Sequence, residues 1–322
     1  MKKLISLILC AAVCAGLLCS CSAKKQTVLS IGEAEVDSEV FAYFFSDVYS
    51  KAEAEGGDLM ATEELTAAAV RSCCEYVAAT TLFHQLQLSI SADSKKNIAT
   101  SVEAEWKLYG DYYTDAGISK QTVAKIFEAM EYRTQLLLYY FGEGSEYEVT
   151  EEEIEYYFDL TYVAFKAING YFTTTDEAGD TVFLPDSEIL AIKSSFENKR
   201  SRLASGESFA DVNDGADVES TFVAVANTAY PEGFLEKVAA LEYDTPTVIE
   251  TDENIFLVVR LNAKTGADNY YRTYRTHYIE ALRGEMLTDM LAATGEEYAP
   301  VKDDGGIQKT VKAVISARND RK

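Results

Sequence analysis

Histidine is almost absent from this sequence, and most of its cysteine lies at one end. Only His84 and His277 occur among 322 residues, and of six cysteines only Cys73 and Cys74 lie beyond position 21. A zinc or iron–sulfur site therefore lacks a set of ligands. No Ser-His-Asp arrangement and no phosphate-binding loop is found. The sequence predicts neither a cofactor nor a metal site.

Positive charge is also scarce. Lys and Arg number 29 against 53 Asp and Glu, which gives a formal net charge of −24 at pH 7. A surface this acidic repels phosphate backbones, so we do not expect nucleic acid as a partner. Hydrophobic residues still make up 48% of the chain, enough to bury real cores. The length favours two domains rather than one.

Residues 1–20 have the layout of a lipoprotein signal peptide. A start with two lysines precedes an apolar stretch that is too short to span a bilayer comfortably. The stretch ends in Leu18-Cys19-Ser20-Cys21, which resembles the bacterial lipobox. The resemblance implies cleavage before Cys21 and a lipid on its sulfur. An ordinary secretory signal with incidental cysteines is the alternative.

The remainder of the chain contains no segment long and apolar enough to cross a membrane. We therefore expect an extracytoplasmic protein that is anchored to the cell membrane by its lipid, with residues 21–27 as a lipidated tether.

Apolar residues recur at helical spacing through residues 28–159, which predicts a helical domain. The adjacent Cys73 and Cys74 point in different directions on a helix, so we interpret them as small residues that fill a helix interface. The chain is expected to start with a short strand or hairpin at Val28–Val36 that turns at Gly32, followed by a helix from Asp37 with Asp37 or Ser38 as its N-cap. Further helices are expected at Thr62–Leu88, Asp93–Leu108, Ser119–Phe141 and Thr150–Phe158.

The pattern changes at Tyr162, and residues 160–264 predict a small α/β domain. Its expected elements are a strand at Tyr162–Thr173, a helix at Pro185–Ser205, an extended piece at Phe222–Val225, a short helix at Phe234–Leu241 and two strands within Thr247–Leu261.

A helix follows within residues 265–300 and carries Ile279, Leu282, Met286 and Met290 on one face. We expect this face to pack on the N-terminal helices, with residues 301–322 as a tail. The predicted fold class is α+β: a discontinuous helical domain with a small α/β domain inserted into it.

Taken together, the sequence resembles the SurA/PrsA family of extracytoplasmic parvulin-type foldases. Val28 to Gly32, followed by an aromatic-rich helix, is similar to the start of the family's chaperone domain. Tyr162 to Ile168 is similar to the opening strand of its parvulin domain, whose pattern is tyrosine, valine, arginine, alanine, lysine, histidine, isoleucine. Leu203 to Ala210 resembles the end of that domain's first helix, and Phe256 to Arg260 resembles its last strand.

Two positions depart from the family's pattern. Ala167 stands where the resemblance implies the first core histidine, and Leu257 stands where it implies the histidine of the last strand. Their side chains offer no hydrogen-bond donor or acceptor. We therefore expect no catalytic residue in this parvulin-like domain.

A substrate-binding surface is expected beside these positions. Tyr230 and Phe234 have the spacing of the methionine and phenylalanine that form the proline pocket in the family. An aromatic pair can grip a prolyl ring or an apolar side chain. The alternative is that Phe234 belongs to the core and that Tyr230, in a loop next to Pro231, is exposed.

The resemblance implies a lipid-anchored chaperone or foldase that binds unfolded or secreted polypeptides, with a parvulin-like domain that does not catalyse. Two other hypotheses remain open at this stage. The chain could be an active peptidyl-prolyl cis/trans isomerase with an atypical centre, or a non-catalytic envelope scaffold with one dedicated partner.

Overall fold

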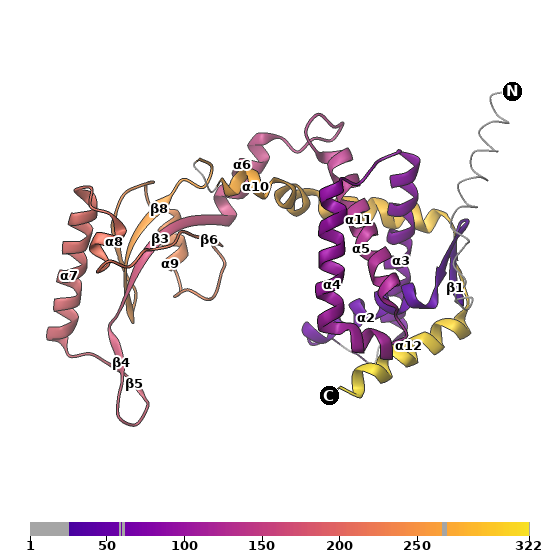
Figure 1. Cartoon of the computed structure of the whole chain (residues 1–322), viewed down its shortest axis with the longest axis horizontal. Helices are drawn as coiled ribbons and strands as arrows, with labels where there is room; N and C mark the ends of the chain where they lie inside the picture. The colour runs from indigo at the N-terminus through magenta and orange to yellow at the C-terminus, as the bar shows by residue number, and fades with distance from the viewer. Residues whose placement is uncertain (1–25, 58, 60–61, 266–268, 322) are drawn as a thin grey trace. The chain divides into compact units, whose positions relative to one another are not determined.

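The structure is a computed structural model that describes residues 26–57, 59, 62–265 and 269–321 (Figure 1). It divides into two compact units. The helical unit consists of the described residues up to Tyr139 and from Gly284 onward, and the sheet unit consists of the described residues within Tyr140–Arg283. The sheet unit is thus inserted between two parts of the helical unit, and the predicted α+β class is confirmed.

The helical unit combines long helices with a small sheet whose strand order is β2-β1-β9. Helices α5 and α11 each extend past its boundary at one end. In chain order its elements are β1 (Thr27–Ile31), β2 (Ala34–Asp37), α2 (Ser38–Ala54), α3 (Thr62–Gln85), α4 (Ala92–Asp115), α5 (Lys120–Phe141), α11 (Arg275–Glu297), β9 (Val301–Lys302) and α12 (Asp304–Asn319).

Of the short strand or hairpin predicted at the start of the chain, the structure has the hairpin, and it leads directly into α2. Gly32 turns the chain with a φ of 60°, a conformation that costs glycine little. The Asp37 carboxylate then accepts hydrogen bonds from the backbone N–H groups of Glu39 and Val40, each at 3.0 Å. Of the two N-caps that the sequence offers, Asp37 and Ser38, the structure uses Asp37, whose side chain satisfies donors that the first helical turn leaves free.

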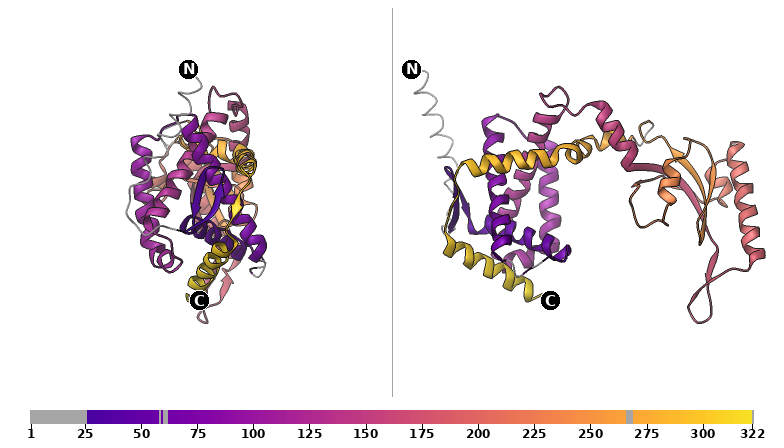
Figure 2. Two further views of the ribbon diagram at one scale, coloured as in Figure 1. Left: turned by 90° about the vertical axis from the view of Figure 1, so that its right-hand side faces the viewer. Right: turned by 180° about the vertical axis from the view of Figure 1, so that it is seen from behind.

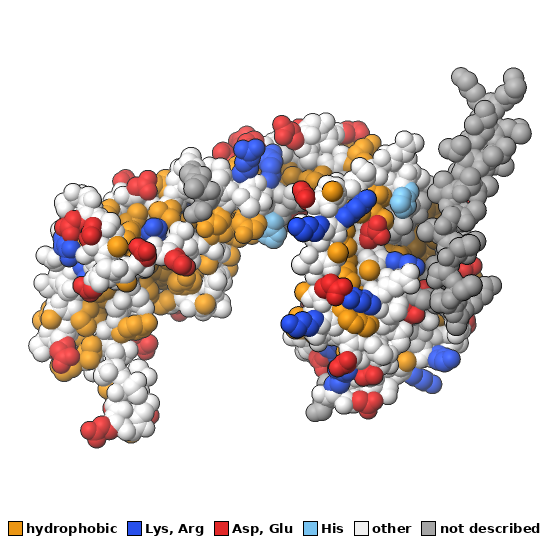
Figure 3. Space-filling model, viewed as in Figure 1, with side chains coloured by type: hydrophobic (Ala, Val, Ile, Leu, Met, Phe, Trp, Pro, Cys, Tyr) orange, Lys and Arg blue, Asp and Glu red, His pale blue; other side chains and the backbone are white. Residues whose placement is uncertain are grey.

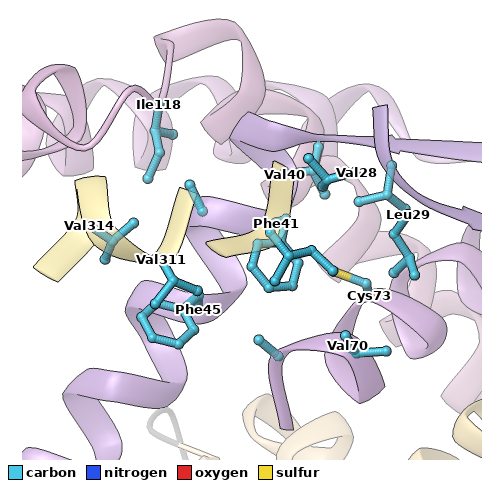
Figure 4. Packing of buried hydrophobic residues seen from close by; sticks show 14 of the residues in the cluster. Val28, Leu29, Val40, Phe41, Phe45, Val70, Cys73, Ile118, Val311 and Val314 are labelled. Atoms are coloured by element: carbon cyan, nitrogen blue, oxygen red, sulfur yellow. The ribbon is translucent and has the colours of Figure 1, made fainter. Parts of the chain in front are cut away.

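Helix α12 completes the core of the helical unit. Its Ile307, Val311 and Val314 are buried in one cluster with Phe41 and Phe45 of α2. Figure 4 shows Val311, Val314 and the two rings. Figure 2 shows α12 (yellow) beside β1 and α2, and these elements are in contact. Residues 301–322 were expected to be a tail; instead they contain β9 and α12, because apolar residues recur at helical spacing there as well.

A half-buried acidic side chain fixes the start of α5. Glu39 accepts hydrogen bonds from the hydroxyl and the backbone N–H of Ser119, at 2.5 and 3.1 Å, and from the hydroxyl of Thr122 at 2.6 Å. Because Glu39 lies in the first turn of α2, this contact joins the N-terminal ends of two helices, where negative charge is favourable.

The buried face of α11 differs from the face that the sequence predicts. Ile279, Leu287 and Leu291 are buried, whereas Met286, which was expected on the buried face, is 55% exposed. A separate short helix, α10 (Tyr270–Thr273), precedes α11, so the expected continuous helix is interrupted. Apolar residues occur around much of the circumference of α11, and their spacing alone did not select the correct face.

Near its end, α11 crosses α3 at close range. A Cβ on Gly295 would lie 2.6 Å from the carbonyl oxygen of Cys74, so only glycine fits there. Cys73 and Cys74 are both buried and form no disulfide. Their expected role as small residues in a helix interface agrees with this crossing.

The sheet unit begins with the acidic helix α6 and contains the larger sheet. In chain order its elements are α6 (Glu151–Thr161), β3 (Tyr162–Tyr171), β4 (Thr173–Thr175), β5 (Thr181–Phe183), α7 (Asp186–Ala204), α8 (Phe209–Val212), β6 (Thr221–Ala224), α9 (Phe234–Ala239), β7 (Thr247–Glu250), β8 (Asn254–Leu261), α10 and the first residues of α11.

Helices cover both faces of this four-stranded antiparallel sheet, whose order is β6-β3-β8-β7 (Figure 1). Helix α9 packs on one face through a cluster that includes Phe165, Phe234 and Val258. Helices α7 and α8 pack on the other face through a cluster that includes Phe196 and Leu257. Side chains of β3 and β8 alternate between the two clusters, as the period of a strand requires.

No helix within the described ranges is long and apolar enough to cross a membrane.

Candidate functional site

The α9 face of the sheet holds the first candidate position, Ala167. Ala167 on β3 is paired with Val258 on β8, and both belong to the cluster under α9. Neither side chain can donate or accept a hydrogen bond. The centre of this face is therefore built from hydrocarbon.

Leu257 lies on the opposite face. It is paired with Ile168 on β3 and is fully buried with Phe196 of α7. The structure does not bring Ala167 and Leu257 together, because adjacent residues of a strand point to opposite sides. The residue of β8 beside Ala167 is Val258, which is also apolar, so the absence of histidine at this centre does not depend on which of the two residues is compared.

Tyr230 and Phe234 are brought together, as the sequence predicts. Their rings are stacked, with centroids 5.6 Å apart and planes 12° apart. Phe234 is fully buried, with its ring 4.2 Å from that of Phe256 and 5.8 Å from that of Phe165. Tyr230 is half-buried. Phe234 is thus a core residue that supports Tyr230 from beneath.

A pocket of about 360 Å³ opens beside Tyr230. It is formed by the loop between β6 and α9 and by the first turn of α9, and Phe234 is not among its lining residues. Those residues are Val225, Ala226, Asn227, Thr228, Tyr230, Pro231, Glu232, Gly233, Leu235 and Glu236.

Two carboxylates dominate the charge of this pocket. Glu232 and Glu236 are both exposed, and in the part of the chain that the structure describes neither has an ion-pair partner. The nearby Lys237 is not among the lining residues, and its ammonium group donates to the backbone carbonyl of Glu250 at 3.3 Å. Sequence reasoning missed both carboxylates, although their positions on either side of Phe234 were visible.

The two histidines contact aromatic side chains in different units. His84 lies edge-on to Phe83 and Tyr132 in the helical unit, and His277 is hydrogen-bonded to the hydroxyl of Tyr162 at 3.0 Å in the sheet unit. Burial raises the pKa of the Cys73 thiol well above its ordinary value, which keeps it protonated. Among the described residues, no group of three or more His, Cys, Asp or Glu side chains could hold a metal ion.

Cys21, the expected lipidation site, lies outside the described residues.

Comparisons with protein-family models and with curated proteins give no match. Among solved structures, the chain is similar to the foldase protein PrsA of Lactococcus lactis, with 11% identity, a TM-score of 0.38 and coverage of 90% of this chain and 99% of that one. For foldase protein PrsA of Streptococcus pneumoniae the identity is 14%, the TM-score 0.34 and the coverage 91% and 94%. For PrsA of Bacillus subtilis the identity is 13%, the TM-score 0.29 and the coverage 79% and 86%. All three are PrsA proteins. They carry the name of the family whose motifs the sequence resembles.

Proposed function

We propose that the protein is a lipid-anchored extracytoplasmic chaperone or foldase that binds unfolded or secreted polypeptides, and that its sheet unit binds them without prolyl isomerase catalysis. One observation carries this proposal. The sheet unit keeps an aromatic pocket at Tyr230, while Ala167 and Val258 leave the sheet face beneath α9 without a polar side chain at its centre.

Catalysis would require more than a pocket. Rotation about a prolyl peptide bond crosses a barrier of about 20 kcal/mol without breaking a bond. An enzyme must therefore bind the twisted amide more tightly than either planar isomer, and placed hydrogen-bonding groups are the usual means. Alanine and valine side chains supply none.

Apolar surface is available outside the pocket as well. Tyr171, Phe183 and Leu190 of the sheet unit are exposed. Figure 3 shows hydrophobic side chains (orange) at the surface of this unit. Exposed apolar side chains of this kind favour contact with the apolar segments of an unfolded chain.

The anchoring part of the proposal is supported by the leader. Its positive start, apolar stretch and cysteine at position 21 are typical of a lipoprotein signal. A diacylglyceryl group on Cys21 has two acyl chains, enough to hold the protein stably at the outer face of the cell membrane.

Aggregation of two unrelated unfolded proteins, followed by light scattering in the presence of the purified protein, tests the binding role. We expect suppression of both, weaker suppression by Tyr230→Ala, and unchanged suppression by Tyr156→Ala, whose side chain is 70% exposed on α6. Failure to suppress either aggregation would contradict the proposal. Binding confined to one native partner would instead favour the scaffold hypothesis.

Active prolyl isomerisation with an atypical centre is the second candidate function. The stacked Tyr230 and Phe234 favour it, because an aromatic platform of this kind can hold a prolyl ring.

A further inference from the structure

The pocket beside Tyr230 carries a charge pattern that the binding role alone does not explain. Resting on the proposed function, we propose that this pocket takes the cationic side chain of a lysine or arginine in an extended polypeptide. The occupant is thus a segment of a bound polypeptide chain, chosen by its positive charge.

The aromatic ring of the pocket is packed against two other rings. Phe234 stacks beneath Tyr230, and Phe165 meets the Tyr230 ring edge-on, with centroids 5.8 Å apart. A ring held in this way presents an electron-rich face, which attracts an ammonium or guanidinium group placed over it. The methylene stem of the same side chain can lie against Val225 and Leu235, which also line the pocket.

The two carboxylates make the pocket selective for charge. Glu232 precedes α9 and Glu236 lies in its first turn, so both ionised groups stand on the rim around Tyr230. Their charges are not neutralised by an ion pair within the described part of the chain, and no lysine or arginine is among the lining residues. A cationic side chain that enters the pocket can therefore pair with these two carboxylates, whereas an acidic side chain is repelled by them.

The charge of the whole chain acts in the same direction. With a formal net charge of −24, the protein attracts basic polypeptides from a distance and repels acidic ones. That long-range field does not distinguish one site from another. The pocket adds a local preference for a cationic side chain, because it combines an aromatic ring, apolar side chains that can contact the methylene stem, and two carboxylates.

Three fluorescent peptides of one flexible sequence, differing only in a central arginine, leucine or glutamate, test the inference by anisotropy titration with the full-length protein. We expect the arginine peptide to bind about fivefold more tightly than the leucine peptide, and the glutamate peptide to bind most weakly. The double variant Glu232→Gln/Glu236→Gln should lose the preference for arginine and keep its affinity for the leucine peptide, which also shows that it remains folded.

A matched control separates the pocket from the general field. Glu177→Gln/Glu219→Gln removes the same charge from exposed positions of the sheet unit outside the pocket, and it should retain the preference. Equal binding of all three peptides by the unchanged protein would overturn the inference and leave the proposed function standing. The inference would also be overturned if Glu232→Gln/Glu236→Gln kept the preference for the arginine peptide, or if Glu177→Gln/Glu219→Gln lost it to the same extent. Absence of binding to any of the peptides would count against the proposed function itself.

Discussion

Ala167 of β3 and Val258 of β8 are cross-strand partners in the sheet, with α9 packed over their face. Cross-strand partners on one face lie within contact of each other, so this pair fills the centre of the face with hydrocarbon. The pair stabilises the sheet by apolar burial, and Val258 is fully buried. The centre of this face therefore has no hydrogen-bonding side chain from either residue, and the proposed lack of catalysis rests on this.

Tyr230, which lines the pocket, and Phe234, which lies beneath it in the core, should contribute differently to the free energy of unfolding. Phe234→Ala removes a fully buried ring and should lower the free energy of unfolding of the sheet unit by about 3–5 kcal/mol. Tyr230→Ala removes a half-buried ring and should cost less, about 1–2 kcal/mol. Urea denaturation followed by circular dichroism measures both. Equal losses would show that Tyr230 is a core residue and not part of an open site.

The order of elements in the sheet unit could be predicted from the sequence because alternation and turn residues mark its strands and helices locally. The sequence could not predict which residues of β8 lie on the same face as Ala167. That depends on the register between the strands, and a shift of one residue exchanges Leu257 for Val258. The pocket could not be predicted either, because it depends on the three-dimensional course of the loop. Only that course brings Glu232 and Glu236 to the same pocket as Tyr230.

In the helical unit, local signals such as the Asp37 cap were sufficient to locate helices. Local signals did not show that α12 belongs to the core of the helical unit. Its partners on β1 and α2 are 250 or more positions away in the sequence. Likewise, the buried face of α11 is set by the elements that pack against it, and its own apolar pattern fits more than one face.

Helix α12 should be required for the stability of the helical unit. Ile307→Ala removes a side chain that is 4% exposed in the core, and should lower the free energy of unfolding by about 2–5 kcal/mol. The exposed Lys309 on the same helix provides a control, since Lys309→Ala should change the stability by less than about 0.5 kcal/mol. Similar small effects of both changes would mean that α12 does not complete this core.

Acid should weaken the contact between α6 and the segment from α10 to the start of α11. A hydrogen bond from the hydroxyl of Tyr271, together with the guanidinium of Arg275, lowers the pKa of Glu151 below its ordinary value of 4.5. The backbone N–H of Thr150, together with the guanidinium of Arg283, lowers the pKa of Glu153.

A carboxyl group whose pKa is lowered by folding stabilises the folded state above its unfolded pKa, and this contribution is lost as the pH falls through the folded value. The contribution of these two groups to the melting temperature of the sheet unit should therefore stay constant from pH 7 to about 4.5 and be lost as the pH falls further. Glu151→Gln/Glu153→Gln should flatten this dependence, and Glu152→Gln, on the same turn of α6, should not. An unchanged pH profile in the double variant would contradict this account of the contact.

The proposed anchor predicts a lipid on one particular cysteine. Metabolic labelling with a radioactive fatty acid should mark the protein, and Cys21→Ala should remove the label and release the protein from the membrane fraction. Cys19→Ala should keep both the label and the membrane association. A label that persists in Cys21→Ala would place the lipid elsewhere.

Prolyl isomerisation by the purified protein, measured with a protease-coupled peptide assay, tests the central claim most directly. Tyr230→Ala is the suitable companion variant, because Phe234→Ala is expected to disturb the core. We predict no rate above the uncatalysed background, from protein that is folded by circular dichroism and suppresses aggregation. Clear catalysis that is lost in Tyr230→Ala would contradict the account and show that a centre built on Ala167 and Val258 isomerises prolyl bonds.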